Sequence, residues 1–130
     1  MIRRLTPGER TLAAGVFGDE VRLGAVRVAA HPFGGFAVTL RDLILFPGEP
    51  PQDFSSAPLH LQAWFIHELT HVHQFQTRPV RTLWSWAKTA AGGGYGPGLP
   101  GYAYPSPFEW SALNLEQQAR AVEHLSLIHI

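Results

Sequence analysis

The hydrophobic and polar positions of the first half of the chain predict one helix followed by strands. Residues 6–9 are typical of a helix start, because Thr6 can cap it and Glu9 can close a capping box. This helix is expected to run to Gly18. Residues 20–29 predict a strand whose alternation shifts at Gly24, where we expect a bulge. Residues 36–40 and 43–46 predict two further short strands.

The second half of the chain has helical rather than alternating periodicity. From Pro58 to about Gln76, apolar residues cover nearly the whole circumference of a helix: Leu61, Trp64, Phe65, Ile66, Leu69, Val72 and Phe75. A helix that is apolar all round is a buried helix, so its few polar residues need an explanation. Residues 92–101 are rich in glycine and predict a loop, and Ser106 begins a last predicted helix that ends near Leu127.

Composition narrows the classes of protein that fit this pattern. The 130 residues suit one domain, spanning 1–130, with a single hydrophobic core. Ten basic and ten acidic residues balance, which argues against nucleic acid and anionic membranes as partners. The chain has no cysteine, so any metal must be held by His, Asp or Glu. No signal peptide is recognisable, and we expect a cytoplasmic protein unless a specialised secretion system exports it.

The polar residues of the predicted buried helix form an HExxH motif, His67-Glu68-Leu69-Thr70-His71. Histidines four residues apart lie on one helix face, so both imidazoles can reach one zinc ion. Glu68 lies about 100° further round the helix, where it suits a general base better than a ligand. Zinc binding explains these buried polar groups better than a polar core cluster does, because an ion would satisfy all three together.

A third protein ligand must come from elsewhere in the chain. Glu116 is our choice, because it follows His71 by 45 residues on a separate predicted helix. Glu109 and Glu123 are rivals near the same helical stripe. Glu109 has a competing role in the capping box with Ser106, and Glu123 is expected to be a solvated surface charge.

Other polar residues near the motif are weaker candidates. His73 follows His71 by about 200° of helical rotation, so it cannot share the same ion. His60 lies two turns before His67 and could line a cleft, although an exposed position suits it better. Tyr102 or Tyr104, beside the glycine-rich loop, could donate to an oxyanion, although loop packing is the more common role.

Three segments together resemble a known family. They are residues 36–46, residues 67–76 (His67-Glu68-Leu69-Thr70-His71-Val72-His73-Gln74-Phe75-Gln76), and Glu116-Gln117-Gln118-Ala119. The chain resembles the gluzincin branch of zincin metallopeptidases, and more closely bacterial metallopeptidase domains encoded with VgrG/Rhs elements and contractile injection systems. The resemblance implies zinc at His67, His71 and Glu116, with Glu68 catalytic. It also implies an α+β, minimal zincin-like fold: a small twisted sheet packed on the HExxH helix, with a glutamate-bearing C-terminal helix.

Two functions compete at this point. In the first, the chain is a zinc metalloendopeptidase that hydrolyses peptide bonds in a peptide or protein substrate through zinc-bound water activated by Glu68. In the second, it is a non-catalytic, zinc-stabilised adaptor or cargo module of a type VI-like or contractile injection system. The intact Glu68 favours the enzyme, because a structural zinc site does not need that carboxylate. The small size of the chain favours the adaptor.

Overall fold

The computed structural model describes residues 2–78 and 115–129, with side chains of the last helix described over residues 117–125. This part of the chain contains four strands, three α-helices and two short 3-10 helices. In chain order they are β1 (Arg3–Arg4), α1 (Pro7–Phe17), η1 (Leu23–Ala25), β2 (Arg27–His31), β3 (Val38–Leu40), β4 (Leu43–Pro47), η2 (Phe54–Ser56), α2 (Leu59–Thr77) and α4 (Leu115–His129).

The four strands form one mixed sheet in the order β1-β2-β4-β3. β2 and β4 are parallel, with Val28 opposite Ile44, whereas β1–β2 and β3–β4 are antiparallel. Arg41, in the two-residue turn between β3 and β4, has a positive φ of 58°. β3 is therefore at one end of the sheet, and the pairing places it next to β4 only, within the described part of the chain.

The segment predicted as a bulged strand, residues 20–29, is divided between two structures. Residues 23–25 form η1, and the strand begins only at Arg27. The Val26 N–H donates to the Leu23 carbonyl at 3.2 Å, which closes the 3-10 turn in place of a sheet ladder. The change of parity seen in the sequence is real, but a turn rather than a bulge at Gly24 causes it.

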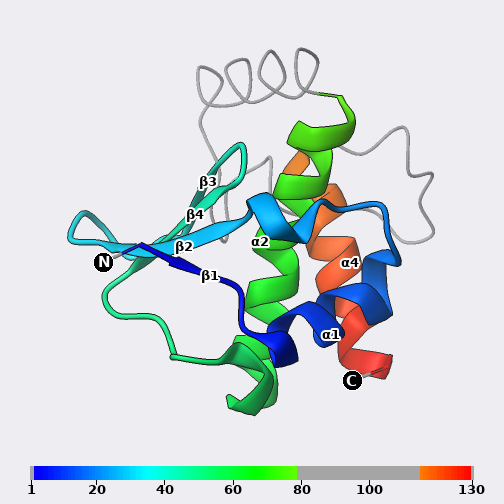
Figure 1. Ribbon diagram of the computed structural model, residues 1–130, viewed down its shortest axis with the longest axis horizontal. Helices are drawn as coiled ribbons and strands as arrows, with labels where there is room; N and C mark the ends of the chain where they lie inside the picture. The colour runs from blue at the N-terminus through cyan, green and yellow to red at the C-terminus, as the bar shows by residue number, and fades with distance from the viewer. Residues whose placement is uncertain (1, 79–114, 130) are drawn as a thin grey trace.

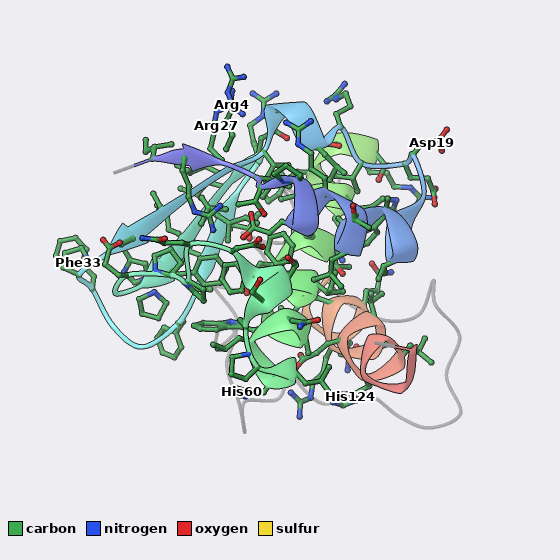
Figure 2. The ribbon with its side chains drawn as sticks, turned by 60° about the horizontal axis from the view of Figure 1, so that its bottom comes forward. Arg4, Asp19, Arg27, Phe33, His60 and His124 are labelled. Atoms are coloured by element: carbon green, nitrogen blue, oxygen red, sulfur yellow. The ribbon has the colours of Figure 1, made fainter. Side chains whose placement is uncertain are left out.

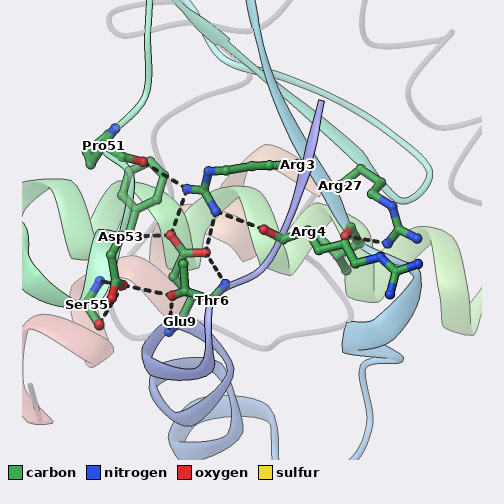
Figure 3. Close-up of polar contacts among 10 residues, drawn as sticks. Arg3, Arg4, Thr6, Glu9, Arg27, Pro51, Asp53 and Ser55 are labelled. Carbon is green, nitrogen blue, oxygen red and sulfur yellow. Dashed lines mark hydrogen bonds and ion pairs between the residues drawn. The ribbon is translucent and has the colours of Figure 1, made fainter. Parts of the chain in front are cut away.

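The start of α1 was predicted correctly. A buried carboxylate in its first turn joins the helix to the rest of the fold. Thr6 and Glu9 form the expected capping box, and the helix ends at Phe17, before Gly18. Glu9 is fully buried and accepts four hydrogen bonds: two from the Arg3 guanidinium at 2.8 and 2.9 Å, and one each from the N–H groups of Thr6 and Phe54. Figure 3 shows this cluster, in which Arg3 also donates to the carbonyl of Pro51. These hydrogen bonds hold β1 and α1 against the segment that precedes α2.

Asp53 extends the same cluster. Its carboxylate accepts from the Thr6 hydroxyl at 2.9 Å and from the Ser55 N–H and hydroxyl at 2.9 and 2.6 Å. The hydrogen bond from the Ser55 side chain is the main reason that the pKa of Asp53 lies below its ordinary value. Asp53 thus caps η2, whereas α2 begins after Pro58 with no side-chain cap.

Helix α2 lies between the sheet and α4, as Figure 1 shows. Its buried face meets β4 and η2 through aromatic rings: Phe54 stacks on Phe65 with centroids 4.9 Å apart, and Phe46 meets Trp64 edge-on at 5.0 Å. Every residue from Phe65 to Thr70 is buried. The prediction of an almost completely buried helix is therefore confirmed for its middle turns.

The arrangement confirms the α+β class and a small sheet packed on the HExxH helix, with the helix that contains Glu116 packed on the other side of α2. None of the described helices combines the length and apolarity that crossing a bilayer requires.

Candidate metal centre

The HExxH residues converge in the middle of α2. His67, Glu68 and His71 each offer a ligand atom, and these three atoms all lie within 4.8 Å of one another. The two imidazoles are one helical turn apart, with ring centroids separated by 5.2 Å and planes inclined at 75°. The spacing of the motif thus produces the expected cluster. Among the described residues, this is the group of His, Asp and Glu side chains whose geometry suits a metal ion.

The position of Glu68 is fixed by the sheet. Glu68 is 5% exposed, and its Oε2 accepts a hydrogen bond of 2.9 Å from the hydroxyl of Thr39, the middle residue of β3. Thr39 is itself buried, so a short strand and the motif helix meet through this contact. A carboxylate held in this way has a defined direction, which a general base needs.

The Nδ1 atom of His67 is engaged by the last helix. It lies 2.9 Å from Oε1 of Glu123, whose side chain is 22% exposed. The expectation that Glu123 is a solvated surface charge is therefore wrong. A carboxylate at this distance is a partner of the histidine ring rather than a charge directed into solvent.

The Nδ1 atom of His71 contacts the side-chain amide of a glutamine. It lies 2.8 Å from Oε1 of Gln74, and Nε2 of Gln74 donates to Oε1 of Gln118 at 3.0 Å. Gln74 belongs to α2 and Gln118 to α4, so α4 supports both histidines. We assigned no role to either glutamine from the sequence. The available signal was that both lie within the segments that carried the family resemblance.

The predicted third ligand, Glu116, lies in the first turn of α4, and its side chain is outside the described residues. Seven residues, about two turns, separate it from Glu123, so both belong to one stripe of that helix. Its role as a ligand stays a prediction. Glu109, Tyr102 and Tyr104 also lie outside the described residues.

The remaining histidines of α2 are placed away from the cluster. His73 stacks on Phe17 with centroids 5.8 Å apart, and its Nε2 lies 3.7 Å from the exposed carboxylate of Glu20. This confirms that His73 faces a different side of α2 from His71. His60 is exposed on the first turn of α2, where Figure 2 shows it.

The donor set fits a zinc ion. Two imidazoles and carboxylate oxygens are ligands that zinc accepts, and histidine ligands in metal sites usually donate their other N–H to a carboxylate or a carbonyl oxygen. Both HExxH histidines have such an oxygen near Nδ1, so Nε2 would be the ligand atom of each ring. His67 and His71 would hold the ion, and Glu116 stays the predicted third ligand.

The described residues form an α+β domain whose HExxH helix brings together three potential metal ligands, and two comparisons relate the chain to a bacterial effector domain. The chain is similar to the effector domain of Pseudomonas aeruginosa VgrG2b, with a TM-score of 0.72 and 28% identity, covering 96% of this chain and 73% of that one. It is also 37% identical over 86 residues to the type VI secretion system spike protein VgrG2b of Pseudomonas aeruginosa. That match covers 57% of this chain but only 8% of the spike protein.

The comparisons correct the family that the sequence predicted. No family model matches the chain, and the similar proteins are VgrG2b and its effector domain, neither of which is described as a zincin. The assignment to the gluzincin branch is therefore wrong as made. The part of the resemblance that concerned VgrG-associated domains is supported, and likeness to a VgrG effector domain replaces the broader family name.

Proposed function

We propose that this chain is a zinc-dependent peptidase module of a type VI secretion system. The observation that carries the proposal is the convergence of His67, Glu68 and His71 within 4.8 Å on one buried helix, with both Nδ1 atoms engaged by other side chains. A polar cluster in a hydrophobic core is costly unless its groups are satisfied, and a divalent cation would satisfy these.

His67 and His71 would hold the ion through Nε2, and Glu116 would complete the protein ligands. When bound, zinc lowers the pKa of a coordinated water and polarises a carbonyl oxygen. Holding the two histidines on one turn of a buried helix keeps their spacing fixed, because packing on both sides resists movement of α2.

Glu68 acts as the general base. Its carboxylate accepts the proton of the water that attacks the substrate carbonyl, and then returns that proton to the leaving amine nitrogen. The hydroxyl of Thr39 donates to Oε2 and keeps the carboxylate directed. An amide at position 68 could neither accept this proton nor return it, so the proton transfer depends on Glu68.

The sheet offers a place for an extended substrate. β3 forms the end of the sheet in the described part of the chain, and its middle residue contacts the proposed base. An extended peptide can pair with such an edge through main-chain hydrogen bonds. A peptide lying along β3 would bring a peptide bond near Glu68, which favours a peptide or protein substrate.

Delivery by a type VI apparatus is the second part of the proposal. It is supported by the likeness to the effector domain of VgrG2b, although the chain spans only 8% of that spike protein's length. The protein should then reach the medium only from cells with an intact apparatus. Release that is independent of the apparatus would contradict this part.

The Glu68→Gln variant tests the activity. Removing a general base lowers kcat by about 10²–10⁴-fold, whereas both histidines and the helix remain. The zinc-loaded proteins are assayed on casein and on a peptide library, with zinc content measured on the same samples. The exposed Glu49→Gln serves as the matched control and should retain full activity.

The expected result is loss of cleavage with retained zinc in Glu68→Gln alone. Equal cleavage by the wild type and Glu68→Gln contradicts the role of Glu68. A fully zinc-loaded wild type that cuts nothing supports the alternative of a zinc-stabilised adaptor or cargo module.

A further inference from the structure

We infer that Glu123 and the paired amides of Gln74 and Gln118 are positioning residues, which hold His67 and His71 in the Nδ1–H tautomer before any metal binds. The inference rests on the proposed metal site, because the tautomer matters for function only if the Nε2 atoms are ligands. It concerns the protein's own hydrogen bonds, however, and can be measured without metal.

Glu123 determines the tautomer of His67. An ionised carboxylate only accepts hydrogen bonds, so the 2.9 Å contact requires the proton to be on Nδ1 of the ring. In a neutral imidazole the lone pair is then on Nε2. The His67 side chain is only 5% exposed, so little solvent competes with this charge-assisted bond.

The two glutamines determine the tautomer of His71 through two consecutive hydrogen bonds. Oε1 of Gln74 only accepts, so Nδ1 of His71 must donate across the 2.8 Å contact. Nε2 of Gln74 donates to Oε1 of Gln118, which opposes a flip of the Gln74 amide. A flip of Gln74 alone would place two oxygens against each other, so only a concerted flip of both amides could reverse the tautomer.

Each histidine is supported by a residue of α4: Glu123 contacts His67 directly, and Gln118 contacts Gln74, which in turn contacts His71. His67, His71 and Gln74 belong to α2, whereas Glu123 and Gln118 belong to α4, and the contacts 67–123 and 74–118 show that the two helices run antiparallel. Docking of α4 therefore orients both rings together. The two supporting groups differ in charge, since a carboxylate supports His67 and a neutral amide supports His71.

The tautomers are measured by long-range ¹H–¹⁵N correlation spectra of the metal-free, ¹⁵N-labelled protein above pH 7.5, a condition that is about one unit above the ordinary histidine pKa. We expect the Nδ1–H pattern for both His67 and His71, assigned with the single His→Ala variants. Glu123→Ala should change the tautomer of His67 only, and Gln118→Ala that of His71 only. An Nε2–H pattern for either ring in the wild type overturns the inference.

Zinc affinity gives the second measurement. Loss of a partner of this kind weakens metal binding by about 10–100-fold, and competition with a chelator should show this for Glu123→Ala. Glu123→Gln keeps an oxygen acceptor without the charge, so we expect it to retain the tautomer and lose less affinity. Glu20→Gln is the matched control, because Glu20 is also a carboxylate near a histidine of α2, His73.

A role of Glu123 in folding alone would lower the thermal stability of Glu123→Ala while leaving the His67 tautomer and the zinc affinity of the folded protein unchanged. That result overturns the inference and leaves the proposed peptidase intact. Failure of the wild type to bind zinc while it shows both Nδ1–H tautomers overturns the proposed function instead.

Discussion

Two polar clusters of this protein each contain a buried glutamate but differ in the groups that surround it. Around Glu9, one carboxylate meets the Arg3 guanidinium and two backbone N–H groups, so the chain supplies both the negative and the positive charge. In α2, the atoms that converge from His67, Glu68 and His71 are electron-pair donors. The charged and polar groups around Glu9 satisfy one another, whereas the three groups in α2 are of the kinds that bind a cation.

The comparison shows that burial of a charged residue does not by itself identify a functional site. Glu9 is the more deeply buried of the two glutamates, at 0% against 5% for Glu68, and its hydrogen bonds join β1, α1 and η2. Glu68 has a hydroxyl partner and two histidines beside it. The kind of partner distinguishes the two sites.

Glu9→Ala should cause the largest loss of stability, and it should distinguish the Glu9 cluster from the cluster in α2. Removing one partner of a buried ion pair costs about 3 kcal/mol or more, and the N–H groups of Thr6 and Phe54 also lose their acceptor. Urea unfolding of the metal-free protein measures the loss. Zinc content of the folded fraction should stay at the wild-type value, and a parallel loss of zinc would show that the clusters are coupled.

Thr39→Val should have a smaller effect, confined to the second cluster. The substitution keeps the shape of the side chain but removes the hydroxyl that donates to Glu68, at a cost of about 1 kcal/mol in unfolding free energy. We expect a decrease in kcat of about tenfold, the equivalent of one lost hydrogen bond, with zinc content unchanged. Thr11→Val, which alters a threonine on the exposed side of α1, is the control. Full activity of Thr39→Val would show that Glu68 needs no support from the sheet.

Local patterns in the sequence predicted the parts of the fold that depend on neighbours along the chain. The capping box of Thr6 and Glu9 and the HExxH helix require only residues within a turn or two, and both formed as expected. The two strands of the β3–β4 hairpin were also predicted, because a short turn joins them. The α+β class was implied by the family resemblance, and these elements agree with it.

Contacts between distant segments could not be predicted in the same way. The parallel pairing of β2 with β4 and the addition of β1 depend on long-range register, which no local pattern specifies. Glu123 was misread because an isolated helix pattern cannot show that α4 docks antiparallel on α2. The alternation shift near Gly24 was seen, but a 3-10 turn and a bulge produce the same shift in the sequence.

The zinc content of the purified protein tests the central claim most directly. After dialysis against metal-free buffer, the wild type and His73→Ala should each contain about one zinc per chain, as expected for a single site of this ligand type. His67→Ala and His71→Ala should contain none, because each removes one of the two imidazoles that the helix holds together. A wild type without zinc, or a His67→Ala variant that retains it, would contradict the account.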